Sequence, residues 1–170
     1  MVLQYDLLNG PVIRAAKTAL ETGDANYIVI WVPEESENTL KNLLEKTCCT
    51  QRIKNNMQNR AIDWYFDTVN RLCFVDRKMM FTGLKSDGCN ENLIISKAVK
   101  AIETGSVEII TDNIPVAYED EVKQRFRQVI NKKNYPVNNP TAGRAYVSAF
   151  FEFMGYVQSL TFEISCKRDH

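Results

Sequence analysis

The sequence repeats itself at one fixed offset, which pairs Ala19 with Ala101. The stretch Ala-Leu-Glu-Thr-Gly at 19–23 returns as Ala-Ile-Glu-Thr-Gly at 101–105. From Val12 to Cys48 this offset gives ten identities in 37 positions, where ordinary composition would give about two or three by chance. A fixed internal period is the signature of one structural unit used more than once. The sequence therefore predicts two pseudo-symmetric helical repeats, at about 9–81 and 90–164.

The matched positions include residues that end and begin helices. Gly23 pairs with Gly105, and Pro33 pairs with Pro115. A glycine just past a helix adopts the left-handed conformation without the Cβ penalty, and a proline suits the start of the next helix. The Glu-Thr-Gly motif is therefore a helix end, not a catalytic signature.

Residues 25–32 fit either a strand or a short helix. Ala-Asn-Tyr-Ile-Val-Ile-Trp-Val alone resembles a buried strand, because it is rich in β-branched and aromatic residues. Its counterpart at 107–114 places Val107, Ile110 and Ile114 at helical spacing. Since the two copies should share one structure, we predict short helices at both places.

Periodic apolar residues predict the remaining helices. The first should follow a short arm, with Asn9 as its cap and Pro11 in its first turn. Two long helices carry the densest apolar patterns, including Trp64, Tyr65 and Leu72 in one of them. A linker is expected at 79–92. The predicted ranges are about 11–22, 34–48, 54–77, 116–131 and 140–164, with Leu40, Leu43, Leu44, Val122, Phe126, Val129 and Ile130 buried.

These patterns predict an all-α fold. We expect one domain over 1–170, a helical bundle in which the helices at 54–77 and 140–164 pack near each other at the centre. The helix at 140–164 is apolar nearly all round, which is typical of a central helix.

Charge and composition narrow the function classes. Lys+Arg and Asp+Glu each number 21, so the net charge is zero, and counterion release would not drive nucleic-acid binding. We see no signal peptide at the start and no apolar run of about 20 residues. We therefore expect a cytoplasmic protein that binds neither nucleic acid nor membrane. The five cysteines, an odd number without CxxC spacing, read as free thiols.

Several catalytic constellations are missing from the sequence. Its single histidine, His170, is the final residue, so Ser-His-Asp, Cys-His and HExxH arrangements are not available. The segment Thr82-Gly83-Leu84-Lys85 resembles a phosphate-binding loop only in composition.

Helical carboxylates are the remaining candidates for chemistry. Asp63 and Asp67 are four residues apart and share a helix face. Glu152 lies within the apolar last helix, where it would need a partner if buried. Candidate partners are Arg144, Lys85 and Arg71. The alternative is that Glu152 lies on an exposed edge or in an ordinary salt bridge.

Six stretches spread over nearly the whole chain carry a family resemblance. They are Asp6-Leu-Leu-Asn-Gly-Pro-Val-Ile, the segment at 19–32, Tyr65-Phe-Asp-Thr-Val-Asn-Arg-Leu, Phe81-Thr-Gly-Leu-Lys, Ala101-Ile-Glu-Thr-Gly-Ser and Gly143-Arg-Ala-Tyr-Val. Together they resemble a family of small uncharacterised bacterial and archaeal proteins, a domain of unknown function with duplicated Ala-Leu-Glu-Thr-Gly repeats.

The resemblance implies exported relatives that begin near His-Cys-Asp and carry a histidine toward the end of each long helix, a set suited to a metal. This chain instead reads Gln4-Tyr5-Asp6, and Cys73 and Gly155 stand at the two helical histidine positions. By the resemblance, Asp6 remains of an ancestral metal site and Cys73 is a soft substitute. We expect no bound metal.

We therefore predict a non-enzymatic helical binding or scaffold module with a degenerate ancestral metal site, which can form a homodimer. The alternative is a metal- or small-ligand-binding protein with a pocket between the two long helices. A third hypothesis is a carboxylate enzyme using Asp63 and Asp67. The sequence identifies no reaction, cofactor or ligand. The candidate pocket residues are Asp6, Cys73, Thr82, Lys85, Arg144, Tyr146, Glu152 and Gly155.

Overall fold

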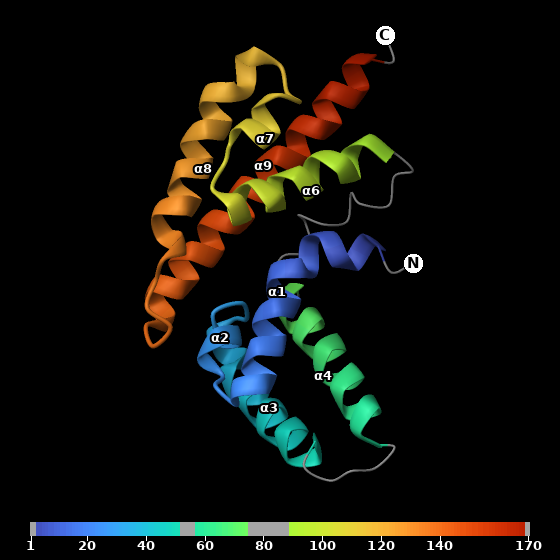
Figure 1. The fold of residues 1–170 in the computed structure, drawn as a ribbon, viewed down its shortest axis with the longest axis vertical. Coiled ribbons are helices and arrows are strands. Elements are labelled where there is room, and N and C mark those ends of the chain that lie inside the picture. Colours follow the sequence, from blue (N-terminus) through green and yellow to red (C-terminus); the bar gives the residue numbers. More distant parts are fainter. Residues whose placement is uncertain (1–2, 52–56, 75–88, 169–170) are drawn as a thin grey trace. The chain divides into compact units, whose positions relative to one another are not determined.

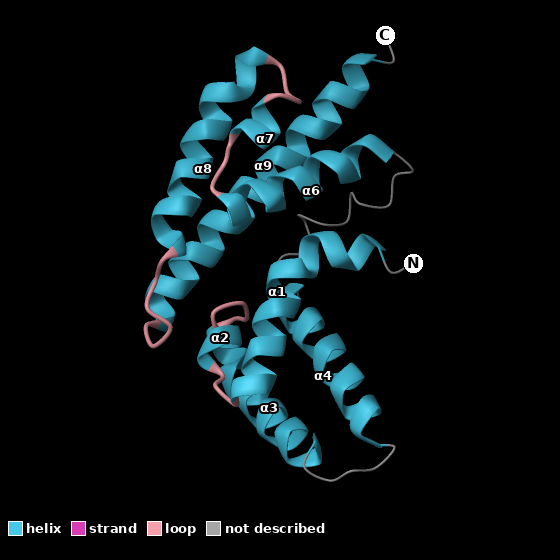
Figure 2. Cartoon of the chain, viewed as in Figure 1, coloured by secondary structure: helices cyan, strands magenta, loops and turns pink. Residues whose placement is uncertain are grey.

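The fold is all-α in the part of the chain that the structure, a computed structural model, describes (Figures 1 and 2). The structure describes the backbone of residues 3–51, 57–74 and 89–168. It describes the side chains of residues 10–50, 60–73 and 93–164. Every regular element in these ranges is helical, as predicted. The α-helices are α1 (Leu3–Thr22), α2 (Asn26–Val29), α3 (Glu37–Gln51), α4 (Met57–Phe74), α6 (Cys89–Thr104), α7 (Glu108–Thr111), α8 (Glu119–Lys133) and α9 (Pro140–Arg168).

Element boundaries recur at the offset of the sequence repeat. α2, α3 and the 3-10 turn Glu34–Ser36 between them begin and end at the positions that match the bounds of α7, α8 and the 3-10 turn Val116–Tyr118. α1 and α6 end at equivalent threonines, Thr22 and Thr104. The predicted helices at 25–32 and 107–114 are therefore confirmed, each as a single turn before a proline.

The chain divides into two compact units. The first unit contains Asn9–Gly83 and Val137–Thr141, and the second contains Met1–Leu8, Leu84–Pro136 and Ala142–His170. α4 therefore belongs to the first unit, and all but the start of α9 belongs to the second. That residues 1–170 form a single domain with these two helices at its centre stays a prediction.

In the first unit, α3 packs against α4 and α2 packs against α3. Leu40, Leu43 and Leu44 are buried as predicted. Tyr65 is fully buried on α4, and its hydroxyl donates to the Ala16 carbonyl of α1 at 3.1 Å. A buried phenol needs such an acceptor, because an unpaired hydroxyl would lose its hydrogen bonds to water.

Trp64 belongs to the apolar pattern that predicts the helix at 54–77, but it does not lie in the core, because its side chain is 58% exposed. Neighbouring residues on a helix point about 100° apart, so Trp64 and Tyr65 cannot both face the core directly. The core face of α4 passes through Tyr65, Val69 and Cys73, which are spaced four residues apart.

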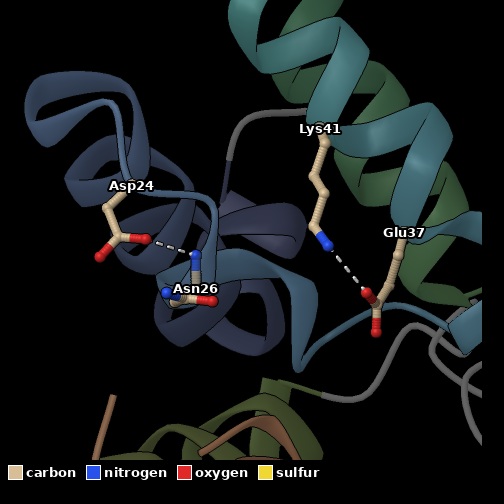
Figure 3. A network of polar contacts seen from close by, with 4 residues as sticks. All are labelled: Asp24, Asn26, Glu37 and Lys41. Atoms are coloured by element: carbon tan, nitrogen blue, oxygen red, sulfur yellow. Dashed lines mark hydrogen bonds and ion pairs between the residues drawn. The ribbon is translucent and has the colours of Figure 1, made fainter. Parts of the chain in front are cut away.

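Polar contacts shape the turn between α1 and α3 (Figure 3). The Asp24 carboxylate accepts the Asn26 backbone N–H at 2.9 Å, at the start of α2. At the start of α3, Lys41 pairs with Glu37 at 3.1 Å. The same residue types pair at the start of α8, where Lys123 lies 2.6 Å from Glu119. Acidic residues suit these first turns because the helix N-terminus carries partial positive charge.

In the second unit, α6 packs against α7 and α8, and aromatic rings from α9 fill the core. Phe153 meets Phe126 of α8 edge to face at 5.9 Å, and Phe150 meets Phe151 at 5.4 Å. Val122 and Val129 are buried as predicted, whereas Ile130 is half-buried. Val129, the residue before Ile130, points into the core instead.

Two predicted boundaries are wrong. α1 begins at Leu3 and runs through Asn9 and Pro11, which were expected to start a helix after a short arm. A proline removes one N–H donor and usually kinks a helix without always ending it. The predicted linker at 79–92 is shorter at its end, because α6 already begins at Cys89. Residues 79–88 lie outside the described residues.

Candidate functional site

The outer face of α4 combines one large aromatic ring with four charged side chains. Trp64 is 58% exposed, and Arg60, Asp63, Asp67 and Arg71 around it are all exposed. We call these five residues the Trp64 face. Most large apolar side chains of the described residues are buried, so an exposed tryptophan among charges marks a candidate contact surface.

The third hypothesis, a carboxylate enzyme using Asp63 and Asp67, requires both side chains to point into one pocket, and the structure contradicts it. Both side chains are exposed on the outer face of α4. They belong to the rim of the Trp64 face.

Two thiols lie around Tyr65 on the inner side of α4. Cys73 is buried on α4, and the Cys48 thiol of α3 donates to the Leu20 carbonyl at 3.8 Å. Burial raises the pKa of Tyr65, and the nearby Cys48 and Cys73 raise it further. Cys48 and Cys49 are free thiols, as the sequence predicts.

The candidate residues on α9 lie on different faces of that helix. Glu152 is exposed and accepts a hydrogen bond from Ser148 Oγ at 3.4 Å, so the exposed-edge alternative describes it. Gly155 is half-buried, and its carbonyl accepts Ser159 Oγ at 3.0 Å. Arg144 is half-buried as well.

Tyr146 turns the other way, into the core of the second unit. Its ring lies 5.6 Å from the Tyr135 ring and 6.3 Å from the Phe150 ring. Burial raises the pKa of Tyr135 above its ordinary value. The aromatic packing of Tyr146 separates it from the exposed Glu152, so the predicted α9 set does not line one site.

The other predicted site residues are outside the described side chains. They are Asp6, Thr82 and Lys85. Within the described part of the chain, no three or more His, Cys, Asp and Glu side chains are grouped so that they could hold a metal ion. Cys73, the soft substitute that the resemblance implies, therefore belongs to no such group among these residues.

A second polar cluster, which sequence reasoning missed, joins α8 and α9 of the second unit. The Arg125 guanidinium lies 4.6 Å from the centre of the Tyr156 ring and 2.7 Å from the Glu121 carboxylate. The Tyr118 hydroxyl bonds the Glu163 carboxylate at 3.1 Å. Burial and Glu121 raise the pKa of Tyr156, while Arg125 lowers it.

These contacts fasten α8 and the turn before it to α9. Only the i,i+4 spacing of Glu121 and Arg125 was visible in the sequence. The other two contacts join residues that are far apart in the sequence.

None of the helices in the described ranges combines the length and the apolar character that crossing a bilayer requires. Neither the curated proteins nor the solved structures contain a significant match to this chain. One family does match, the family of unknown function DUF6448, over residues 9–156. The match spans most of both repeats expected from the sequence, and the chain therefore belongs to this family of unknown function.

Proposed function

We propose that this protein is a non-enzymatic helical binding module made of two copies of one helical unit. The observation that carries the proposal is the Trp64 face, where a tryptophan is 58% exposed between two basic and two acidic side chains. Tryptophan and arginine are the residue types that most often dominate the energy of protein interfaces. When a partner covers an exposed tryptophan, the burial of its apolar surface contributes about 2 kcal/mol or more to the free energy of binding.

The recurrence of element boundaries supports the duplication. The short helix, the 3-10 turn and the following 15-residue helix return at the offset of the sequence repeat. α1 and α6 also end in the same way. The backbone N–H of Gly23 and that of Gly105 each donate a 2.8 Å hydrogen bond to the carbonyl four residues earlier. A duplicated unit also explains why charge and aromatic content can differ between copies while the turns stay alike.

The placement of the helical carboxylates supports a non-enzymatic role. Asp63 and Asp67 on α4 and Glu152 on α9 are all exposed, whereas the acid and base of a hydrolase converge on the substrate in a sheltered cleft. These residues instead add polar character to helix surfaces.

A turnover screen tests this role. Wild-type protein and the variants Glu152→Gln and Asp63→Asn/Asp67→Asn would be assayed with panels of ester, phosphoester, glycoside and amide substrates. We expect no turnover above the buffer rate for any of them. Hydrolysis by the wild type that disappears in Glu152→Gln or in the double variant would sink the proposal.

The alternative is a metal- or small-ligand-binding protein, derived from the ancestral metal site, with a pocket between the long helices. Its specific support is Cys73, a buried thiol that lies near Tyr65 on the inner face of α4. Thiolates prefer soft or borderline metals such as zinc and copper(I).

Elemental analysis tests the alternative. Tag-free wild type and Cys73→Ala would be measured before and after incubation with zinc, nickel, copper and iron. Stoichiometric metal that disappears in Cys73→Ala would establish the alternative. Equal metal content and equal melting temperature in both proteins would remove it. Cys49→Ala is the matched control, because Cys49 is an exposed thiol.

The proposal also includes the compartment and the partners. We propose a cytoplasmic protein, since exposed and half-buried thiols at Cys49 and Cys48 persist best in a reducing compartment. The zero net charge of the chain favours a protein partner over nucleic acid.

A further inference from the structure

We infer that the partner of the Trp64 face is a second copy of the same face, so that two α4 helices pair antiparallel in a homodimer. This inference rests on the binding role proposed above and specifies the partner. It follows from two observations. Arg60, Trp64 and Asp67 lie along one stripe of α4, and the two charged residues of this stripe form no ion pair with other described residues.

The three residues form one continuous stripe. Spacings of four and three residues place Arg60 before and Asp67 after Trp64 along the helix, within about one sixth of the helix circumference. All three side chains are exposed. A partner helix laid along the stripe would therefore meet a positive charge, an aromatic ring and a negative charge in order.

The charges of the Trp64 face are not paired within the described part of the chain. The structure pairs Lys41 with Glu37, Lys123 with Glu119 and Arg125 with Glu121 on other helices. Arg60, Asp63, Asp67 and Arg71 make no such pair among the described residues. Asp67 and Arg71 stand four residues apart, in a favourable order for an ion pair, and still remain separate.

The order of charges on the stripe is complementary to itself. With a two-fold axis through Trp64, Arg60 lies about 6 Å along the helix on one side and Asp67 about 4.5 Å on the other. In an antiparallel partner these heights are reversed, so each Arg60 comes level with the partner copy's Asp67 to within about 1.5 Å. An isologous contact therefore makes two ion pairs around a central pair of tryptophan rings.

The second unit shows how a ring at the equivalent position is covered. Tyr146, which the offset of the sequence repeat pairs with Trp64, is only 9% exposed. The Tyr135 ring covers it at 5.6 Å with an interplanar angle of 30°. A neighbouring aromatic ring is thus the cover used at this position, and in the antiparallel pair each Trp64 provides that ring for the other.

Sedimentation equilibrium of the full chain tests the inference. Measurements would span about a hundredfold range of protein concentration under reducing conditions, because Cys49 is exposed and must not link copies. We expect a monomer–dimer equilibrium for the wild type. Trp64→Ala should raise the dissociation constant by about tenfold or more.

Charge reversal gives a sharper test. Arg60→Glu and Asp67→Arg each turn two attractive contacts into two repulsive ones and should each weaken the dimer by about tenfold. The double variant Arg60→Glu/Asp67→Arg restores opposite charges across the axis and should recover wild-type affinity to within about threefold. Phe162→Ala is the matched control, because Phe162 is a large exposed apolar residue of the second unit, and it should leave the dissociation constant unchanged.

Far-ultraviolet circular dichroism and melting temperature show whether each variant remains folded. A wild type that is monomeric throughout the range overturns the inference, and so does a dimer that is insensitive to Trp64→Ala and to both charge reversals in folded protein. Failure of the double reversal to restore a dimer lost in both single variants also overturns it. The turnover screen decides the proposed role separately: a monomer without turnover contradicts only the dimer, and a dimer with Glu152-dependent turnover contradicts only the non-enzymatic role.

Discussion

Gly23 and Gly105 adopt the same left-handed backbone conformation, with φ of 74° and 77°. Each donates its N–H at 2.8 Å to the carbonyl four residues earlier, in Ala19 and Ala101 respectively. The two residues end α1 and α6 in the same way and turn the chain into the short helix that follows. The recurring element order depends on these two turns.

Replacing either glycine by alanine should lower the free energy of unfolding by about 1–2 kcal/mol, because a Cβ disfavours positive φ. A Cβ added at either position would meet nothing within 4 Å, so the loss would come from the backbone alone. Gly23→Asn and Gly105→Asn are matched controls and should lose less, since asparagine tolerates the left-handed region. Urea denaturation would measure all four variants. Equal losses for alanine and asparagine would contradict this account.

Lys133, a residue of α8, caps the C-terminal end of α6. Its ammonium donates to the Ile102 carbonyl at 2.6 Å and to the Glu103 carbonyl at 3.0 Å. Lys133→Met should lower the free energy of unfolding by about 1 kcal/mol, because the last carbonyls of a helix gain from a cationic donor.

Lys132→Met is the control, since Lys132 is an exposed lysine of the same last turn. It should change stability by less than about 0.5 kcal/mol. Chemical denaturation of the two variants side by side measures the difference, and equal losses would show that the two carbonyl contacts contribute nothing.

Tyr65 should make stability depend on alkaline pH. Burial raises the pKa of its phenol in the folded state, while the unfolded side chain ionises near its usual value of about 10. Between these values the folded state binds more protons, so the free energy of unfolding falls as pH rises above about 10. Denaturation midpoints measured from neutral to alkaline pH would show this fall.

Tyr65→Phe removes the ionisable group and should flatten part of this alkaline dependence. The same variant should lose about 1 kcal/mol at neutral pH, because the hydrogen bond to Ala16 is absent. Tyr27→Phe is a control tyrosine from the same unit. An unchanged alkaline slope in Tyr65→Phe would mean that another group, such as Tyr135, carries the dependence.

Arg125 and Tyr156 should be energetically coupled. A double-mutant cycle with Arg125→Met and Tyr156→Leu should give a coupling of about 0.5–1 kcal/mol, as for a cation near the face of an aromatic ring. Arg127→Met, an exposed arginine of the same helix, should show no coupling to Tyr156→Leu. Urea denaturation would provide the four stabilities of each cycle, and a coupling of zero in the first cycle would count against the stacked geometry.

The sequence by itself determined the helical class and the helix ends at Gly23 and Gly105. These features depend on residues within one turn of each other, so local spacing is enough to predict them. The choice of helix over strand for residues 25–32 also came from the sequence, through comparison with its second copy.

The tertiary structure decided which way the ambiguous residues face. Trp64 and Tyr65 are adjacent and both aromatic, so local pattern alone could not choose between them, and only packing against α1 and α3 turned Tyr65 inward. On α9, apolar residues nearly surround the helix, and packing alone separated buried Tyr146 from exposed Glu152. Long-range contacts set the rotation of a helix about its own axis. The sequence therefore could not show that the Trp64 face points outward, and only the structure revealed it.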